Sequence, residues 1–330
     1  MSGQMLHQSV LLNEVVEALC PLKGGCYLDA TFGNGGYSRA ILDNADCAVI
    51  AIDRDPDAIA RGAPMISEYA SRFFLAEGCF SDMADLVRDQ CPQQGGLHGA
   101  AFDLGVCSTQ LDQPERGFSF RSDGPLDMRM SKSGQSASDV VMKMAEADLA
   151  RILWEYGEEK ASRRIAKAIC RVRDETAITT TDQLASIIRG VMPAKKPDQI
   201  DPSTRSFQAL RIFVNRELDE LTAGLAAAEA LLRPGGILAV VSFHSLEDRI
   251  VKRFLASRSQ HAARPSRHLP PANGPAPTFE LLRRKAVVPS DDERRDNSRA
   301  RSAKLRIARR TDAPLNMGGP RASRELASCG

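Results

Sequence analysis

A glycine-rich turn and three carboxylates are the residues with the clearest chemical potential in this sequence. Asp29 and the string Gly33-Asn-Gly35-Gly36 follow one short apolar run, Asp53 ends a second run, and Asp103 lies in a later one. Glycines let the backbone approach a ligand closely, and free amides at a helix start can bind an anion. An acid at the end of the second strand can accept both hydroxyls of a ribose. The pattern therefore predicts a bound nucleotide cofactor.

The spacing of the first turn separates the candidate cofactors. The three-glycine dinucleotide fingerprint is not met, because Ser38 and Arg39 stand where a third spaced glycine would fall. The string Asp29-Ala-Thr31-Phe-Gly33-Asn-Gly35 instead resembles the Asp-x-Gly-x-Gly-x-Gly loop of S-adenosylmethionine-dependent methyltransferases, with Thr31 replacing the first glycine. The later string Leu-x-Pro-Gly-Gly at 232–236 also resembles that class. We therefore expect S-adenosyl-L-methionine as the cofactor.

Alternating strands and helices are expected to position these residues. Four short apolar runs end near Gly or an acid and are separated by helical patterns: Cys26–Ala30, Cys47–Ile52, Arg72–Leu75 and Gly99–Leu104. This alternation predicts an α/β fold, a parallel sheet with helices on both faces. Together with the resemblance of the first turn, it implies a Rossmann-like class I methyltransferase sheet. A fifth strand is expected over Leu232–Phe243. Leu281–Val288 and Ala303–Arg309 are expected to pair as an antiparallel hairpin at one sheet edge.

The middle of the chain shows helices without strands. Apolar residues at helical spacing predict helices over Ser138–Tyr156 and Glu158–Asp174, and Thr180–Met192 opens with a capping box. Pro193–Pro202 is expected to be a hinge or boundary, and a long helix is expected over Thr204–Leu232. The resulting domain prediction has three parts: a methyltransferase domain of residues 1–130 and 206–310, an inserted all-helical substrate-recognition domain of residues 131–205, and a disordered tail of residues 311–330.

The distribution of charge and the spacing of the cysteines limit the partners and the cellular compartment that the sequence allows. The net charge is only +2, yet basic residues gather at Lys160–Arg173, at Arg249–Arg267 and at Arg294–Arg310. Because phosphates are contacted mainly by Lys and Arg, three clusters favour a nucleic-acid partner. No apolar run approaches the roughly 20 residues of a membrane span, and no signal peptide is evident. Eight cysteines without a Cys-x-x-Cys pair suit reduced thiols in a cytoplasmic protein with no metal site.

Several longer motifs carry a family resemblance. They occur in order along the chain: Asp103-Leu-Gly-Val106, Gln110-Leu-Asp112, Arg116-Gly-Phe-Ser-Phe120, Gly124–Met130, Phe207–Ile212, Ser242–Lys252 and Arg299–Arg306. From His7 to about Arg310 the sequence resembles the ribosomal RNA small subunit methyltransferase H family. The resemblance implies methyl transfer to the N4 amine of a decoding-centre (P-site) cytosine in 16S rRNA, with the small ribosomal subunit as partner and no membrane. A homodimer is compatible with the sequence, which does not determine it.

The resemblance also implies a set of cofactor-binding residues. Matched by position they are Gly35, Gly36, Tyr37, Asp53, Phe80, Asp103 and Gln110. Tyr37 stands where members usually have His, and Cys107-Ser-Thr109 replaces the usual Ser-Ser-Pro. For Phe80, a contact with the adenine and a plain core position are both open.

Asp103 is the predicted catalytic residue. A cytosine amine is a poor nucleophile because its lone pair is delocalised into the ring, and an acceptor for its N–H would localise that pair and take up developing charge. The alternative for Asp103 is a cap of the following loop.

Four further residues are candidates for substrate binding, each with a structural alternative. Phe118 and Phe120 are expected either to stack on a flipped base or to anchor their loop. Arg116, together with Arg121 and Arg129 of the same loop, is expected either to bind phosphate or to pair with Asp112, Asp123 and Asp127. His244 is expected either to line the pocket or to be a structural histidine.

Three other functions compete with this interpretation. A DNA amino-methyltransferase would use the same chemistry, but its usual Asn/Asp/Ser-Pro-Pro-Tyr/Phe motif is absent at Asp103-Leu-Gly-Val106. A non-enzymatic rRNA-binding assembly factor on the same fold would not need Gly35, Asp53 and Asp103 intact. An NAD-dependent dehydrogenase fails on the first loop.

Overall fold

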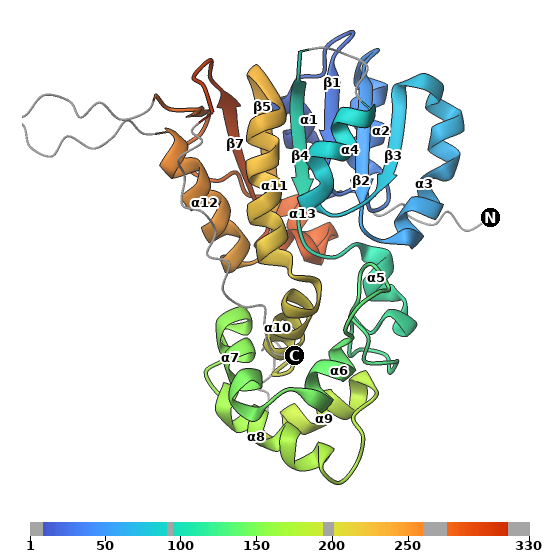
Figure 1. Cartoon of the computed structure of the whole chain (residues 1–330), viewed down its shortest axis with the longest axis vertical. Helices are drawn as coiled ribbons and strands as arrows, with labels where there is room; N and C mark the ends of the chain where they lie inside the picture. Colours follow the sequence, from blue (N-terminus) through green and yellow to red (C-terminus); the bar gives the residue numbers. More distant parts are fainter. Residues whose placement is uncertain (1–8, 91–94, 194–200, 260–275, 316–330) are drawn as a thin grey trace, which may run out of the picture.

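In the part of the chain that the structure describes, a seven-stranded sheet forms the centre of the molecule, in strand order β3-β2-β1-β4-β5-β7-β6. The computed structural model describes residues 9–90, 95–193, 201–259 and 276–315. Strands β1 to β5 run parallel, and β7 lies antiparallel between β5 and β6 (Figure 1). The strands are β1 Cys26–Asp29, β2 Ala48–Asp53, β3 Phe73–Glu77, β4 Leu97–Asp103, β5 Leu232–Ser242, β6 Phe279–Leu281 and β7 Lys304–Arg310.

Helices cover both faces of this sheet, which confirms the predicted Rossmann-like α/β class. One face packs against α1 Leu12–Leu19, α2 Gly36–Asn44 and α3 Pro56–Tyr69. The other face packs against α4 Met83–Gln90, α11 Glu217–Leu231 and α12 Ser245–Ser259. Shorter elements complete the described chain: α5 Ser108–Asp112, α13 Asp291–Asp296, and the 3₁₀ turns η1 Ala70–Arg72, η2 Phe80–Asp82, η3 Pro114–Arg116 and η4 Ser298–Ser302. Among the residues that the structure describes, none of the helices combines the length and apolar character that a membrane span needs.

The predicted edge hairpin is confirmed in its pairing but not in its bounds. Strands β6 and β7 pair antiparallel at the edge of the sheet. The first strand ends at Leu281, where the sequence predicted it to begin, and Val287 forms only an isolated bridge to Leu305.

Within the described residues, five helices form a second lobe with its own core. They are α6 Ala137–Lys143, α7 Glu146–Gly157, α8 Ser162–Arg173, α9 Thr181–Val191 and α10 Thr204–Asn215, and Figure 1 shows α6 to α9 gathered beyond one end of the sheet. The hydrophobic core of this lobe runs from Phe118 to Leu210. It is thus wider than the predicted 131–205 insertion, because the loop after β4 and the helix α10 both contribute side chains. Residues 194–200 of the predicted hinge and 316–330 of the predicted tail lie outside the described residues.

Two predicted long helices are each interrupted. The helix expected over Ser138–Tyr156 is divided into α6 and α7, and the one expected over Thr204–Leu232 is divided at Arg216, whose φ is 50°. Asn215 fixes the second break, since its side chain donates to the Met128 carbonyl at 2.7 Å and accepts from the Met130 amide at 2.8 Å. These bonds connect distant segments, which helical periodicity cannot reveal.

The Thr180 capping box is present as predicted.

Candidate functional site

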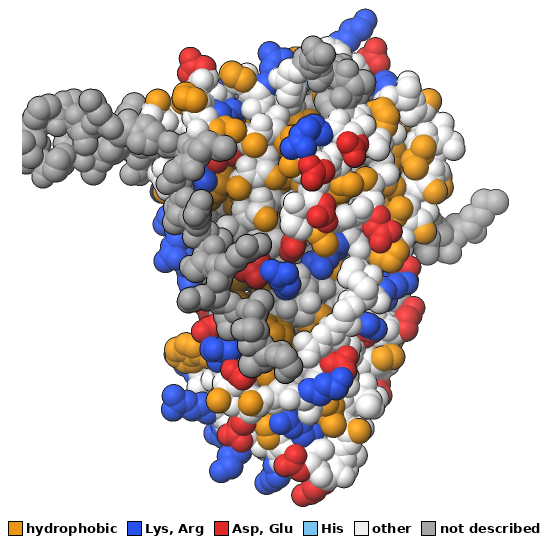
Figure 2. Space-filling model, in the orientation of Figure 1, with side chains coloured by type: hydrophobic (Ala, Val, Ile, Leu, Met, Phe, Trp, Pro, Cys, Tyr) orange, Lys and Arg blue, Asp and Glu red, His pale blue; other side chains and the backbone are white. Residues whose placement is uncertain are grey.

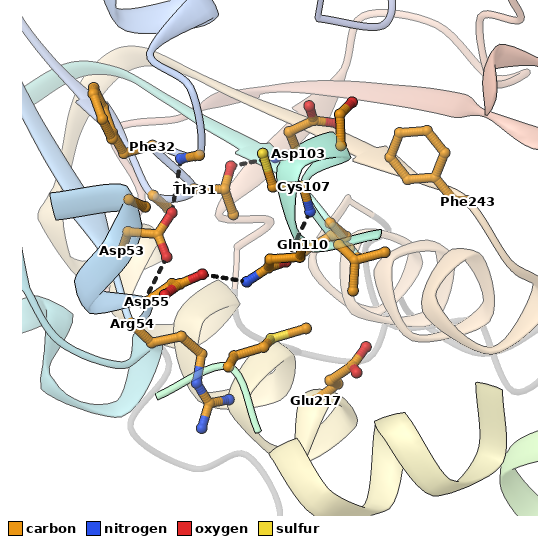
Figure 3. A pocket seen from close by; sticks show the side chains of 18 of the residues that line it. Thr31, Phe32, Asp53, Arg54, Asp55, Asp103, Cys107, Gln110, Glu217 and Phe243 are labelled. Carbon is orange, nitrogen blue, oxygen red and sulfur yellow. Dashed lines mark hydrogen bonds between the residues drawn. The ribbon is translucent and has the colours of Figure 1, made fainter. Parts of the chain in front are cut away.

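A cavity of about 380 Å³ opens at the carboxyl ends of β1, β2 and β4. Sequence order reverses here, since β1 lies between β2 and β4, and ligands of open α/β sheets bind at such a point. Six of the predicted site residues line the cavity: Tyr37, Asp53, Phe80, Asp103, Gln110 and His244. In Figure 3, Asp53 and Asp55 lie on one side, Phe243 and Glu217 on the other, and Asp103 between them.

The glycine turn shapes one wall of this cavity. Gly35 has a φ of 78° and precedes the first residue of α2, a conformation that favours glycine. A Cβ on Gly35 would lie 2.8 Å from Met65 Sδ, and one on Gly36 would lie 2.1 Å from Ser9 Oγ. Neither glycine itself lines the cavity, whereas Gly33 and Asn34 do. The sequence located the turn correctly, and its close packing explains the two later glycines.

Asp53 closes the turn against the second strand. Its Oδ2 accepts the Gly33 amide at 2.7 Å, and its Oδ1 accepts the Asp55 amide at 2.9 Å. Burial raises the pKa of Asp53, and these backbone hydrogen bonds oppose that effect. Each carboxylate oxygen can accept more than one hydrogen bond, so the side chain retains capacity for two ligand hydroxyls.

Asp29 has a structural place rather than a ligand-binding one. Its buried carboxylate accepts the amide and the hydroxyl of Ser38 at 3.1 and 2.7 Å, and the amide of Thr31 at 3.2 Å. Burial raises its pKa to about 6, against the lowering effect of these bonds. Asp29 thus fastens the start of α2 to the end of β1.

Asp103 carries an unsatisfied buried oxygen at the cavity. Its Oδ1 is buried without a hydrogen-bond partner in the described part of the chain. Burial, followed by the charges of Asp29 and Glu247, raises the pKa of Asp103 well above its ordinary value. The backbone N–H of Asp103 donates to Thr31 Oγ1 at 2.7 Å. Thr31, which stands where the methyltransferase motif has its first glycine, therefore holds the end of β4 in place. A capping role would require an amide donated to this carboxylate, and no described residue supplies one to Oδ1.

An ion network forms the far wall of the cavity, and the sequence predicted only His244 of its members. Arg211 donates from Nε and from one terminal nitrogen to the two oxygens of Glu217, both at 2.8 Å. His244 Nε2 lies 3.0 Å from Glu247 Oε1, and Glu247 also accepts the Phe243 amide at 2.8 Å. This network joins segments that lie more than 25 residues apart in the sequence, so a local motif cannot predict it.

Three members of this network have the chemistry of metal ligands. Within the described residues, Glu217, His244 and Glu247 form a group whose ligand atoms all lie within 4.8 Å of one another. Arg211 already supplies a positive charge to Glu217 through two hydrogen bonds. Arg211 therefore compensates the charge of Glu217.

Gln110 and Arg116 share one partner, Asp55. Gln110 Nε2 donates to Asp55 Oδ2 at 2.7 Å. One terminal nitrogen of Arg116 contacts both Asp55 oxygens at 3.1 and 2.9 Å and Asp57 at 2.8 Å, and the other donates to backbone carbonyls of 129 and 130. Arg116 is only 5% exposed and does not line the cavity. The geometry favours the ion-pair alternative for Arg116, but its partners Asp55 and Asp57 lie 61 and 59 residues before it in the sequence and are not the acids proposed from the sequence.

The aromatic candidates divide between cavity and core. Phe118 is 6% exposed in the core of the helical lobe, and Phe120 packs edge-on against Phe207 with ring centroids 4.8 Å apart. Both positions favour the loop-anchoring alternative over base stacking. Phe80 lines the cavity and also contacts Phe102 at 5.3 Å between centroids. The Tyr37 hydroxyl donates to the Val10 carbonyl, and burial raises its pKa well above its ordinary value.

The arrangement defines a class of protein. An antiparallel β7 between β5 and β6, a glycine turn after β1, an acid at the end of β2 and a second acid at the end of β4 together describe a class I methyltransferase.

The chain belongs to the MraW methylase family, whose model matches residues 4–311. A protein of Paramagnetospirillum magneticum named ribosomal RNA small subunit methyltransferase H is 58% identical over 310 residues, covering 93% of this chain and 96% of the relative. One of the same name from Rhodospirillum rubrum is 53% identical over 323 residues, covering 96% and 98%. A solved rRNA methylase of Streptococcus thermophilus aligns with a TM-score of 0.41 at 10% identity, covering 93% of this chain and 99% of that one. The predicted family is confirmed, and the cofactor is S-adenosylmethionine.

Proposed function

We propose that this protein transfers a methyl group from S-adenosylmethionine to the exocyclic N4 amine of a decoding-centre cytosine in 16S rRNA of the small ribosomal subunit. The names of these relatives support an rRNA substrate, and the sequence resemblance supports the cytosine and its place in the rRNA. The single observation that carries the amine chemistry is the buried Asp103 Oδ1 at the cavity, which has no hydrogen-bond partner in the described chain.

The residues around the first turn fit the cofactor. S-adenosylmethionine supplies an electrophilic methyl group when it is bound. Asp53 would accept the ribose hydroxyls, and the backbone of Gly33 and Asn34, which line the cavity, would receive the methionine end. Phe80 would lie against the adenine, and Gln110 would hold the loop after β4 through Asp55.

Asp103 would act directly on the amine. An exocyclic N–H that donates to its carboxylate would localise the nitrogen lone pair toward the methyl group. The raised pKa makes this carboxylate a stronger base, suited to receive the proton that the amine loses on methylation. Thr31 would keep Asp103 in place through the hydrogen bond to its backbone N–H. Asp103 is thus assigned as the acceptor and Thr31 as a positioning residue.

The test is methyl transfer to small ribosomal subunits purified from cells that lack this protein. Mass spectrometry of 16S rRNA should detect one new N4-methylcytosine after incubation with the wild-type protein and cofactor. The Asp103→Asn variant should lose about 10²- to 10³-fold in the single-turnover rate, since one transition-state contact is removed. Calorimetry should show that the variant still binds the cofactor. An unmodified cytosine with the wild-type protein, or a normal rate with the variant, would refute the proposal.

The same assay addresses the two remaining alternatives. A DNA amino-methyltransferase would methylate duplex DNA in preference to small subunits. A non-enzymatic assembly factor would bind the subunit and show no heat of cofactor binding.

A further inference from the structure

The three basic clusters of the sequence differ in how far their charges are paired within the chain. In the cluster at Arg294–Arg310, Lys304 and Arg306 both pair with Asp248, and Arg309 pairs with Glu280. In the described part of the second cluster, Arg249 pairs with Glu158 and Arg258 with Glu229. Much of this charge is therefore balanced internally and is less available to a polyanion.

The third cluster forms a line of unpaired charges along α8. Arg163, Lys167 and Arg171 are exposed and lie four residues apart, so they share one side of the helix. Ile165 and Ile169 are buried on the other side. None of these three basic residues forms an ion pair with any residue that the structure describes, which leaves the whole line facing solvent.

A groove between α7 and α8 adjoins this line and contains an exposed indole. Trp154, the single Trp of the chain, is 57% exposed. The groove has a volume of about 1190 Å³, and it is lined by Trp154, Arg151, Lys160, Arg163 and Arg164 along with Glu146 and small residues. Figure 2 shows Lys and Arg side chains along the outer edge of the lobe where Figure 1 places α7 and α8. A large aromatic surface exposed beside several cations is chemically complementary to a base and its phosphates.

We propose that the α7/α8 groove and the basic line along α8 bind a single-stranded segment of rRNA. A base would stack on Trp154, and the phosphates that follow it would lie along Arg163, Lys167 and Arg171. The inference rests on the proposed function and extends it, because it places an RNA contact outside the cavity that holds Asp103. The cavity would select the methylated nucleotide, while this surface would supply affinity.

The first test is the Trp154→Ala variant, with naked 16S rRNA and intact small subunits as separate probes. Loss of one stacked base should raise the Kd for both probes about 5- to 150-fold. Leu22→Ala is the matched control, because Leu22 is 55% exposed on the sheet domain and should leave Kd unchanged. Cofactor affinity by calorimetry and the thermal midpoint should stay at wild-type values in both variants, which excludes a folding defect.

The second test removes the charges. The triple variant Arg163→Ala, Lys167→Ala, Arg171→Ala should lower the slope of log K against log salt by about 2, the value for three contacts to a single strand. Lys23→Ala, an exposed lysine before β1, should leave the slope unchanged.

Three results would overturn the inference. Unchanged binding and salt dependence in both variants would remove rRNA from this surface. Weaker binding to subunits alone, with naked rRNA unaffected, would assign the groove to a ribosomal protein. A Trp154-dependent shift in sedimentation would assign it to a second copy of the chain. Wild-type methylation in the same preparation shows whether the proposed function itself holds, so the two failures remain distinguishable.

Discussion

Replacing Arg116 by Met tests whether this residue supports the fold or contacts RNA. The side chain of Arg116 is 6% exposed and that of its partner Asp55 is 1% exposed, so the substitution leaves a buried carboxylate without its ion pair. Breaking a buried pair from one side costs about 3–5 kcal/mol. With an unfolding entropy of about 2.1 cal/mol/K per residue, the 330 residues give about 0.7 kcal/mol/K. The thermal midpoint should therefore fall by about 4–7 °C.

Differential scanning calorimetry measures this change, with Arg121→Met as the control. Arg121 is an exposed arginine of the same loop, and its side chain forms no ion pair in the described structure. Its substitution should move the midpoint by less than about 1 °C, because surface changes usually stay within about 0.5 kcal/mol. If Arg116→Met keeps the wild-type midpoint and weakens only RNA binding, the structural assignment is wrong and Arg116 contacts phosphate.

Three further predictions concern catalysis, cofactor binding and stability. The pKa of Asp103 is raised, so protonation removes the carboxylate acceptor as the pH falls through that raised pKa. The acid limb of the kcat/KM profile should therefore have its midpoint above pH 4. A midpoint at or below about pH 4 would contradict this prediction. Gly35→Ala should strain the backbone by about 1–2 kcal/mol, because Gly35 has a left-handed φ, and the added methyl group would displace Met65. Calorimetry should therefore detect weaker cofactor binding. An unchanged Kd would show that the turn tolerates a side chain. Asn215→Ala removes three side-chain hydrogen bonds and should lower the free energy of unfolding by about 3 kcal/mol in urea titration, whereas a loss below about 1 kcal/mol would mean that water replaces them.

Local patterns determine the elements that the sequence predicted well. Apolar runs of four to six residues ending near Gly or an acid located β1 to β4, and the glycine turn located the cavity. The Thr180 capping box involves residues only three apart, so it was readable directly.

Long-range contacts determine what the sequence could not predict. Arg116 contacts Asp55 across 61 positions, and Asn215 contacts Met128 across 87. Acids much nearer in sequence to Arg116, such as Asp112, offered equally good partners on chemical grounds. The Arg211–Glu217 pair was hidden for a different reason: a helix was predicted straight through Arg216, and its actual break there turns both side chains toward the cavity.

The strand order has a consequence for synthesis of the chain. Strand β4 ends at Asp103, but its neighbour β5 begins at Leu232, 129 residues later. At about 5–20 residues per second, a ribosome needs roughly 6–26 s to make that stretch. Throughout this interval one side of β4 offers unsatisfied backbone groups to any passing strand. Early folding of the helical lobe would shorten the effective distance between the two strands, and nascent chains truncated before Leu232 should be the ones that engage chaperones.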